Sequence, residues 1–85
     1  MSRAKTLEEL KSARNQLTTL DARCTKVCQS DGLTYIECNY KGIRVRIPVA
    51  VPFPVRLLGC QIHFIPAAID ETGEFAVGQM VLESE

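Results

Sequence analysis

Arginine and tyrosine side chains are concentrated in and just before a stretch of the chain that has no acidic residue. No aspartate or glutamate occurs between Asn39 and Ile69. Arginine guanidinium groups and tyrosine rings suit phosphate oxygens and the faces of nucleobases. We therefore predict a non-enzymatic binding site for a small anionic, nucleotide-like ligand, on a strand face or in a groove between subunits. Its candidate residues are Tyr35, Lys41, Arg44, Arg46 and Arg56.

A solvated strand face is the alternative interpretation of the same side chains. Glu37 and Arg46 can form one exposed cross-strand ion pair, which contributes less than about 1 kcal/mol. The formal net charge is zero, which gives weak long-range attraction to DNA. Nucleic acid is therefore not an expected partner, and a small anion or a host protein is expected instead.

Thiols and the single imidazole form a second set of reactive side chains. Cys24 and Cys28 are spaced by one helical turn, and Cys60 lies three positions before His63. Three cysteines and a histidine can hold a structural zinc ion. However, Cys60 and His63 on one strand would point to opposite faces. No metal or other cofactor is therefore expected, and a zinc-stapled structural module remains an alternative.

No motif brings catalytic side chains together. His63 lies between Ile62 and Phe64, an apolar setting typical of a packed histidine, and the five glycines are scattered instead of forming a phosphate-binding loop. Nucleophilic catalysis would need this histidine within hydrogen-bond reach of a nucleophile and a carboxylate. An enzyme is therefore not expected.

The first element expected to position these residues is a helix. Thr6-Leu7-Glu8-Glu9 has the pattern of a capping box. From Leu10 to Val27, apolar residues recur at spacings of three and four, in a narrow stripe typical of a coiled-coil seam. The pattern predicts one long amphipathic helix over residues 6–29, ended by Gly32.

Residues 33–48 predict a β-hairpin with Lys41 and Gly42 as its two-residue turn. This register places apolar side chains on one face and polar side chains on the other, and a slip of one residue would mix the two faces. The predicted apolar pairs are Tyr40 with Ile43, Cys38 with Val45, and Ile36 with Ile47, and the polar pairs are Asn39 with Arg44 and Glu37 with Arg46.

A proline-rich connection over residues 49–58 and a second hairpin over residues 60–83 are expected to follow. The connection is predicted to lay Val51, Phe53 and Val55 over apolar surface. The second hairpin has a predicted loop over residues 71–73 with Gly73 in the left-handed region. Its predicted pairs are Ile69 with Phe75, Ala67 with Val77, Phe64 with Met80, His63 with Val81, and Ile62 with Leu82.

Together these elements predict a single α+β domain over residues 1–85, with one long N-terminal amphipathic helix followed by two antiparallel β-hairpins. Both faces of the second hairpin are apolar, and one helix covers only one face of a small sheet. A second copy of the chain would cover the other face, so a homo-oligomer is expected. Its predicted interface residues are Leu10, Leu17, Leu20, Ile65, Phe75, Val77 and Val81. A protein–protein inhibitor that docks on a host protein through this apolar, acidic hairpin is the other alternative function.

The distribution of charged and apolar residues along the chain bears on its cellular location. Residues 1–56 carry a formal charge of +5 and residues 57–85 one of −5. The uncharged run over residues 47–55 is far shorter than the roughly 18 residues of a membrane span, so no membrane partner is expected. The first residues lack the apolar core of a signal peptide, which favours the cytoplasm and free thiols.

In layout, the chain resembles the short helix-plus-hairpin accessory proteins encoded by bacteriophages and other mobile elements. The resemblance covers residues 6–48 and is carried by the predicted helix from Thr6 to Cys28 and by the strands on both sides of the Lys41-Gly42 turn. It implies a non-enzymatic protein that blocks a host component or sequesters a small signalling molecule. The second hairpin departs from that layout, which often ends in another helix.

Overall fold

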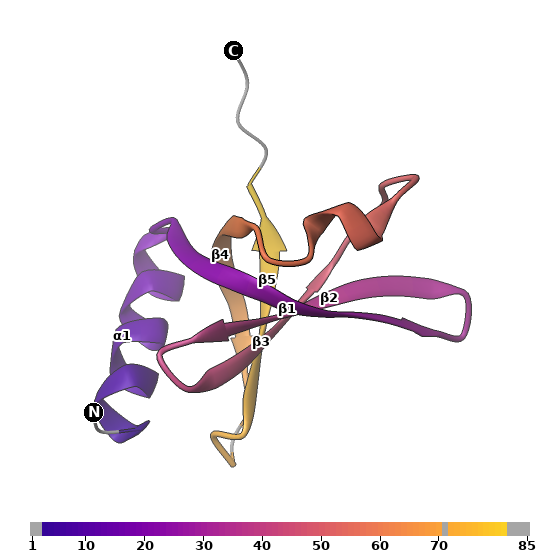
Figure 1. Cartoon of the computed structure of the whole chain (residues 1–85). Helices are drawn as coiled ribbons and strands as arrows, with labels where there is room; N and C mark the ends of the chain where they lie inside the picture. The colour runs from indigo at the N-terminus through magenta and orange to yellow at the C-terminus, as the bar shows by residue number, and fades with distance from the viewer. Residues whose placement is uncertain (1–2, 71, 82–85) are drawn as a thin grey trace.

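The computed structural model describes residues 3–70 and 72–81. These residues form one α-helix, a short 3-10 helix and a closed five-stranded barrel (Figure 1). Strands neighbour one another in the order β1-β2-β3-β5-β4, and β4 pairs with β1 to complete the barrel. Only the β3–β5 pairing is parallel among the strand pairs of the described residues. The elements are α1 (Arg3–Gln16), β1 (Leu20–Ser30), β2 (Leu33–Tyr40), β3 (Ile43–Pro48), the 3-10 helix η1 (Pro54–Leu57), β4 (Gln61–Ile69) and β5 (Phe75–Met80).

This mixed sheet contradicts the predicted fold of two simple hairpins after a long helix. The α+β class is right, but β5 lies between β4 and β3, and β1 lies between β4 and β2. The homo-oligomer stays a prediction, which rests on a flat second hairpin that is apolar on both faces. In the barrel, one of those faces lines the interior, where Ile62, Phe64 and Ala76 are buried.

The predicted helix over residues 6–29 is wrong beyond Gln16. Leu17 has a φ of 55°, and Thr18 N–H donates to the Ala13 carbonyl at 2.9 Å, which ends α1 in a Schellman-type cap. After that cap, Leu20, Ala22 and Cys24 alternate with exposed residues, as in a strand. The apolar residues of this stretch fit a helical period and a strand period, and the β-branched residues at 18, 19, 25 and 27 favour the strand.

The capping box at Thr6 is also wrong, because α1 already begins at Arg3. Thr6 is buried inside the helix. The Glu9 carboxylate does not cap the helix. It accepts hydrogen bonds from the Tyr40 hydroxyl and from Lys41 Nζ, the latter at 2.8 Å. These contacts join α1 to the β2–β3 turn.

The register predicted for the β2–β3 hairpin is confirmed at all five pairs. Lys41 and Gly42 have φ values of 50° and 91°, as a two-residue turn matched to strand twist requires. Gly42 N–H also donates to Asn39 Oδ1 at 2.8 Å. This register buries Ile43, Val45 and Ile47 and turns the alternate side chains of β3 outward.

The predicted β4–β5 pairing is right at Phe64 and Met80 and wrong near the loop. A bulge between Pro66 and Ala68 shifts the register by one residue, so Ile69 faces Ala76 and Ala68 faces Val77. Gly73 has the expected positive φ, at 75°. Residues 71 and 82, which belong to the predicted loop and to the predicted Ile62–Leu82 pair, lie outside the described residues.

The connection between β3 and β4 does not lie flat on the core as predicted. Val49 and Leu57 pack against the core cluster, whereas Val51, Phe53 and Val55 are exposed. The 3-10 turn from Pro54 to Leu57 changes the direction of the chain, so only part of the segment faces the barrel. Among the described residues, no helix is long and apolar enough to cross a membrane.

Leu17 is a left-handed residue without the freedom of glycine, and its side chain is 73% exposed. We predict that Leu17→Gly raises the free energy of unfolding by about 0.5 to 1 kcal/mol, because it relieves backbone strain and loses little packing. Lys11→Gly, in the same helix, is the control and should lower the value by about 0.5 to 1 kcal/mol. Urea unfolding measures both, and a less stable Leu17→Gly protein would contradict the strain argument.

The contacts of Glu9 make stability depend on pH. Hydrogen bonds from Lys41 and then from Tyr40 hold the pKa of the Glu9 carboxyl below its ordinary value of 4.5. A carboxyl with a lowered folded-state pKa stabilises the fold above its unfolded pKa, and this contribution is lost as pH falls through the folded value. We predict that wild-type stability falls more steeply than that of Glu9→Gln between about pH 5 and pH 3.

Glu8→Gln is the matched control, because it keeps the Glu9 contacts and should follow the wild type. Urea midpoints measured across this pH range provide the comparison. Parallel curves for wild type and Glu9→Gln would show that the helix contact contributes nothing to stability.

Candidate functional site

The guanidinium of Arg46 lies between two aromatic rings on the outside of the barrel. Its Cζ is 4.5 Å from the centroid of Phe75 and 5.9 Å from the centroid of Tyr35. The three side chains come from three neighbouring strands, with β3 between β2 and β5. Cations over aromatic faces are attracted by the ring quadrupole, so the rings hold the guanidinium in place.

Part of the hydrogen-bonding capacity of Arg46 is unused. Its Nε is buried and has no hydrogen-bond partner among the described residues. The nearest carboxylate oxygen, Glu37 Oε2, is 3.8 Å away, beyond hydrogen-bond distance, while the Arg46 side chain as a whole is 39% exposed. A buried donor without a partner is costly. An oxyanion would therefore meet the exposed part of the guanidinium, which the two rings hold in place.

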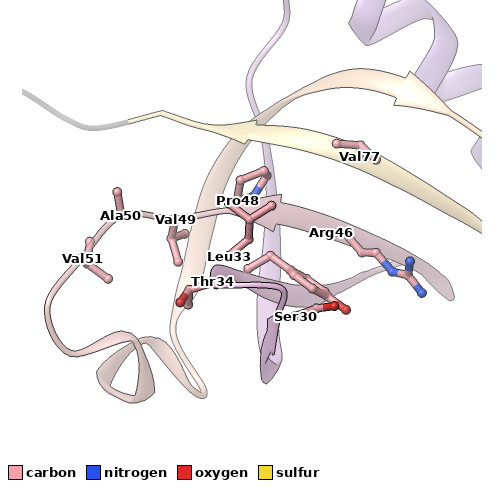
Figure 2. A pocket seen from close by; sticks show the side chains of 11 residues that line it. Ser30, Leu33, Thr34, Arg46, Pro48, Val49, Ala50, Val51 and Val77 are labelled. Carbon is pink, nitrogen blue, oxygen red and sulfur yellow. The ribbon is translucent and has the colours of Figure 1, made fainter.

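A cavity of about 830 Å³ opens beside Arg46, between the β1–β2 turn and the segment that follows β3 (Figure 2). Figure 2 shows Arg46 at one end and Val51 at the other. The wall is mostly apolar. It consists of Ser30, Gly32, Leu33, Thr34, Tyr35, Arg46, Pro48, Val49, Ala50, Val51 and Val77. This arrangement suits a ligand with a flat apolar body and an anionic end.

Tyr35 forms a wall of the cavity and keeps its proton. The Cys28 thiol is its cross-strand neighbour, and a hydrogen bond between the two side chains raises the pKa of the Tyr35 phenol. A phenol is protonated at neutral pH even at its ordinary pKa of 10.0, and the Tyr35 ring offers a stacking surface.

The structure brings together three of the five predicted ligand-binding residues. Tyr35 and Arg46 line the cavity, and Arg44 is exposed on the same outward face of β3. Lys41 lies at the β2–β3 turn, where it pairs with Glu9 at 2.8 Å. Arg56 lies in η1, with its guanidinium 5.2 Å from the centroid of Phe53. Neither Lys41 nor Arg56 lines this cavity.

Sequence reasoning missed the contributions of β5 and of the loops to this site. Phe75 and Val77, which the sequence predicts in an oligomer interface, face Arg46 and the cavity, and their place in an interface stays a prediction. Their outward alternation was visible in the sequence, whereas the parallel β3–β5 pairing that places them there was not. The turn at residues 31–32, predicted to end a helix, instead joins β1 to β2 beside the cavity.

The other predicted interface residues occupy different environments. Leu10 is fully buried within its own chain, so it is not available to a second copy. Leu17 is exposed, and Leu20, Ile65 and Val81 are half-buried.

The four weak metal candidates do not converge. Cys24 points into the core, Cys28 lies on the outer surface beside Tyr35, and Cys60 is exposed before β4. His63 is hydrogen-bonded to Asp21 across the β1–β4 pair. Among the residues that the structure describes, no three His, Cys, Asp or Glu side chains form a group that could hold a metal ion.

Cys38 faces Cys24 inside the barrel, where neither thiol is reactive. Burial raises the pKa of Cys24, and burial together with the neighbouring thiol raises the pKa of Cys38 to about 12. Both are therefore protonated at neutral pH and act as small apolar core residues.

No protein-family model matches the chain, and no curated protein or solved structure is significantly similar to it.

Replacing Arg46 tests whether the residue is held for stability or for binding. We predict that Arg46→Met lowers the free energy of unfolding by less than about 1 kcal/mol, because the lost ion pair is long and partly exposed. The methionine side chain keeps apolar contact with both rings. Urea unfolding gives the value, and a loss of several kcal/mol would mean that the Glu37–Arg46 pair is structural.

Proposed function

We propose that this chain is a non-enzymatic binding protein for nucleotide units, which it holds on the outward face of β2, β3 and β5. The observation that supports this most strongly is the position of Arg46, whose half-exposed guanidinium is held by Tyr35 and Phe75 at the edge of an apolar cavity. The guanidinium takes a phosphate, and the ring of the nucleotide stacks on Tyr35 in the cavity. A cytoplasmic location, expected from the sequence, belongs to the same proposal.

The strand order also supports a nucleotide ligand. A closed five-stranded barrel with a parallel β3–β5 pair has the topology of the oligonucleotide- and oligosaccharide-binding barrel. Barrels of that type bind their ligands on the face of strands 2 and 3, between the β1–β2 and β4–β5 loops. Tyr35, Arg44 and Arg46 lie on this face.

A single strand of nucleic acid is a better candidate than an isolated nucleotide. Arg44 and Arg46 are two residues apart on one face of β3, which separates them by roughly 6 to 7 Å along the strand. Two cations in a row can follow consecutive phosphates, while the cavity accepts one unstacked base. Zero net charge argues against long-range attraction to DNA, but it does not prevent short-range stacking and phosphate contacts.

Fluorescence anisotropy with a labelled hexathymidylate tests the proposal. Tyr35→Ala should weaken binding by about 5- to 150-fold, because base–aromatic stacking contributes about 1 to 3 kcal/mol. Arg46→Met should weaken it by at least about tenfold, as expected when a phosphate loses a charged donor. With two phosphates contacted, log K should fall with log salt concentration with a slope of about −1.4.

Arg56→Gln is the matched control, because Arg56 lies in η1 away from the cavity and its removal should leave binding unchanged. Unlabelled AMP and a duplex of the same length are the competitors. Competition by AMP alone, with no hexathymidylate binding, would identify a mononucleotide site. Unchanged affinity in Arg46→Met and Tyr35→Ala, or equally tight duplex binding, would refute the proposed site.

A further inference from the structure

The connection between β3 and β4 carries a concentration of exposed apolar side chains. Val51, Phe53, Val55 and Leu58 are 37%, 61%, 63% and 48% exposed, respectively. We call these four residues, with Arg56 among them, the connector surface. In Figure 1, η1 lies on the side of the barrel away from α1. Several exposed large apolar side chains within eight residues are a feature of interaction sites.

Both ends of the connector are held by hydrogen bonds to the barrel. Val49 N–H donates to the Thr34 carbonyl at 3.1 Å. At the other end, Gly59 N–H donates to the Cys24 carbonyl, and Cys24 N–H donates to the Cys60 carbonyl, both at 2.9 Å. Pro52 and Pro54 restrict the backbone between these points. The connector surface is therefore preorganised, which reduces the entropy lost when a partner binds.

Main-chain groups are also free along the connector. The amides of Ala50, Val51 and Phe53 donate no hydrogen bond to any described residue. Unpaired amides beside apolar side chains are the features that an extended peptide uses when it adds alongside a protein backbone. In a lipid bilayer these amides would lose water without gaining a partner, so a polypeptide is favoured over a membrane.

The positive charge of the connector surface favours a polypeptide that carries acidic side chains. The Arg56 guanidinium stacks over Phe53, and Arg23 Nη1 reaches the Gly59 carbonyl at 3.4 Å. The connector itself carries no acidic residue, because none occurs between Asn39 and Ile69. Asp21, which precedes Arg23 on β1, is hydrogen-bonded to His63. A partner with carboxylates would therefore meet positive charge at this surface.

We infer that the connector surface binds an extended segment of another protein in which apolar side chains alternate with acidic ones. The apolar side chains contact Phe53, Val55 and Leu58, the carboxylates pair with Arg56 and Arg23, and carbonyl groups accept from the free amides. This site does not use Arg46, but it shares Ala50 and Val51 with the wall of the cavity.

Nuclear magnetic resonance with a synthetic hexapeptide of alternating glutamate and leucine tests this inference on the whole chain. Addition of the peptide should shift the amide signals of Ala50, Val51 and Phe53. A lysine–leucine peptide of the same length should bind at least about tenfold more weakly, because it lacks charge complementarity. Equal affinity for both peptides, or shifts confined to another surface, would overturn the inference.

Three variants separate this surface from the nucleotide site. Phe53→Ser with Val55→Ser should abolish peptide shifts while keeping hexathymidylate binding, because both side chains are exposed and contribute little to folding. Arg56→Glu should reverse the preference toward the lysine peptide and retains the apolar surface if the double variant is unstable. Arg46→Met should retain the peptide shifts and lose oligonucleotide binding.

Two further outcomes would assign the connector surface to a different occupant. Sedimentation with phosphatidylglycerol vesicles, without peptide shifts, would indicate a membrane. A dimer by light scattering that Phe53→Ser with Val55→Ser converts to a monomer would indicate a second copy of this chain. Either result would overturn the inference of an acidic peptide.

Discussion

The parallel pairing of β3 with β5 is the contact on which the rest of the structure depends. It joins Val45 to Ala76 and closes a sheet that would otherwise have two open edges. The interior that results is tight. A Cβ added to Gly78 would approach Phe64 to 2.8 Å and Val45 to 3.3 Å, so glycine at this position lets β5 come close enough to pair with β3. Without this closure, the apolar residues of β4 and β5 would need another partner, which is why they suggested an oligomer when considered as an isolated hairpin.

The same pairing creates the candidate site. Because Arg44 faces Phe75 and Arg46 faces Val77 across the pair, the outward side chains of β5 lie beside the outward arginines of β3. Arg46 is then covered by aromatic carbon on two sides, and its Nε loses water without gaining a partner. A buried donor without a hydrogen-bond partner is destabilising, and the contacts with the two rings and with Glu37 offset that cost, so Arg46 adds little to stability. The exposed part of the guanidinium is then the part that a ligand can contact.

Local features of the sequence predicted the β2–β3 hairpin and with it three of the five site residues. The Lys41-Gly42 turn determines its own register, and the neighbours of Arg46 on β2 follow from that register. The predicted helix runs too far because one set of apolar residues fits both a helical and a strand period, and because Asp31-Gly32 also fits a helix end. Both residues have positive φ, at 53° and 77°, and Ser30 faces Leu33, so the dipeptide is the turn of a second tight hairpin. The Asp-Gly signal was available, whereas the β3–β5 and β1–β4 pairings are non-local and leave no pattern in a single sequence.

Barrel closure also changes how the balanced charge of the chain should be interpreted. The acidic residues of the last third include Asp70 and Glu74, which lie beside the β4–β5 loop. Arg3 lies at the same loop, where its Nη2 donates to the Gly73 carbonyl at 2.6 Å. The arginines of β3 and of the connector occupy other parts of the surface. Each basic region is therefore small, and attraction at long range stays weak whatever the ligand. Recognition by this chain must then come from contact, in which an aromatic ring, an apolar wall and one oriented guanidinium act together. A net charge of zero does not argue against an anionic ligand under those conditions, and it favours a ligand that brings an apolar body with its charge.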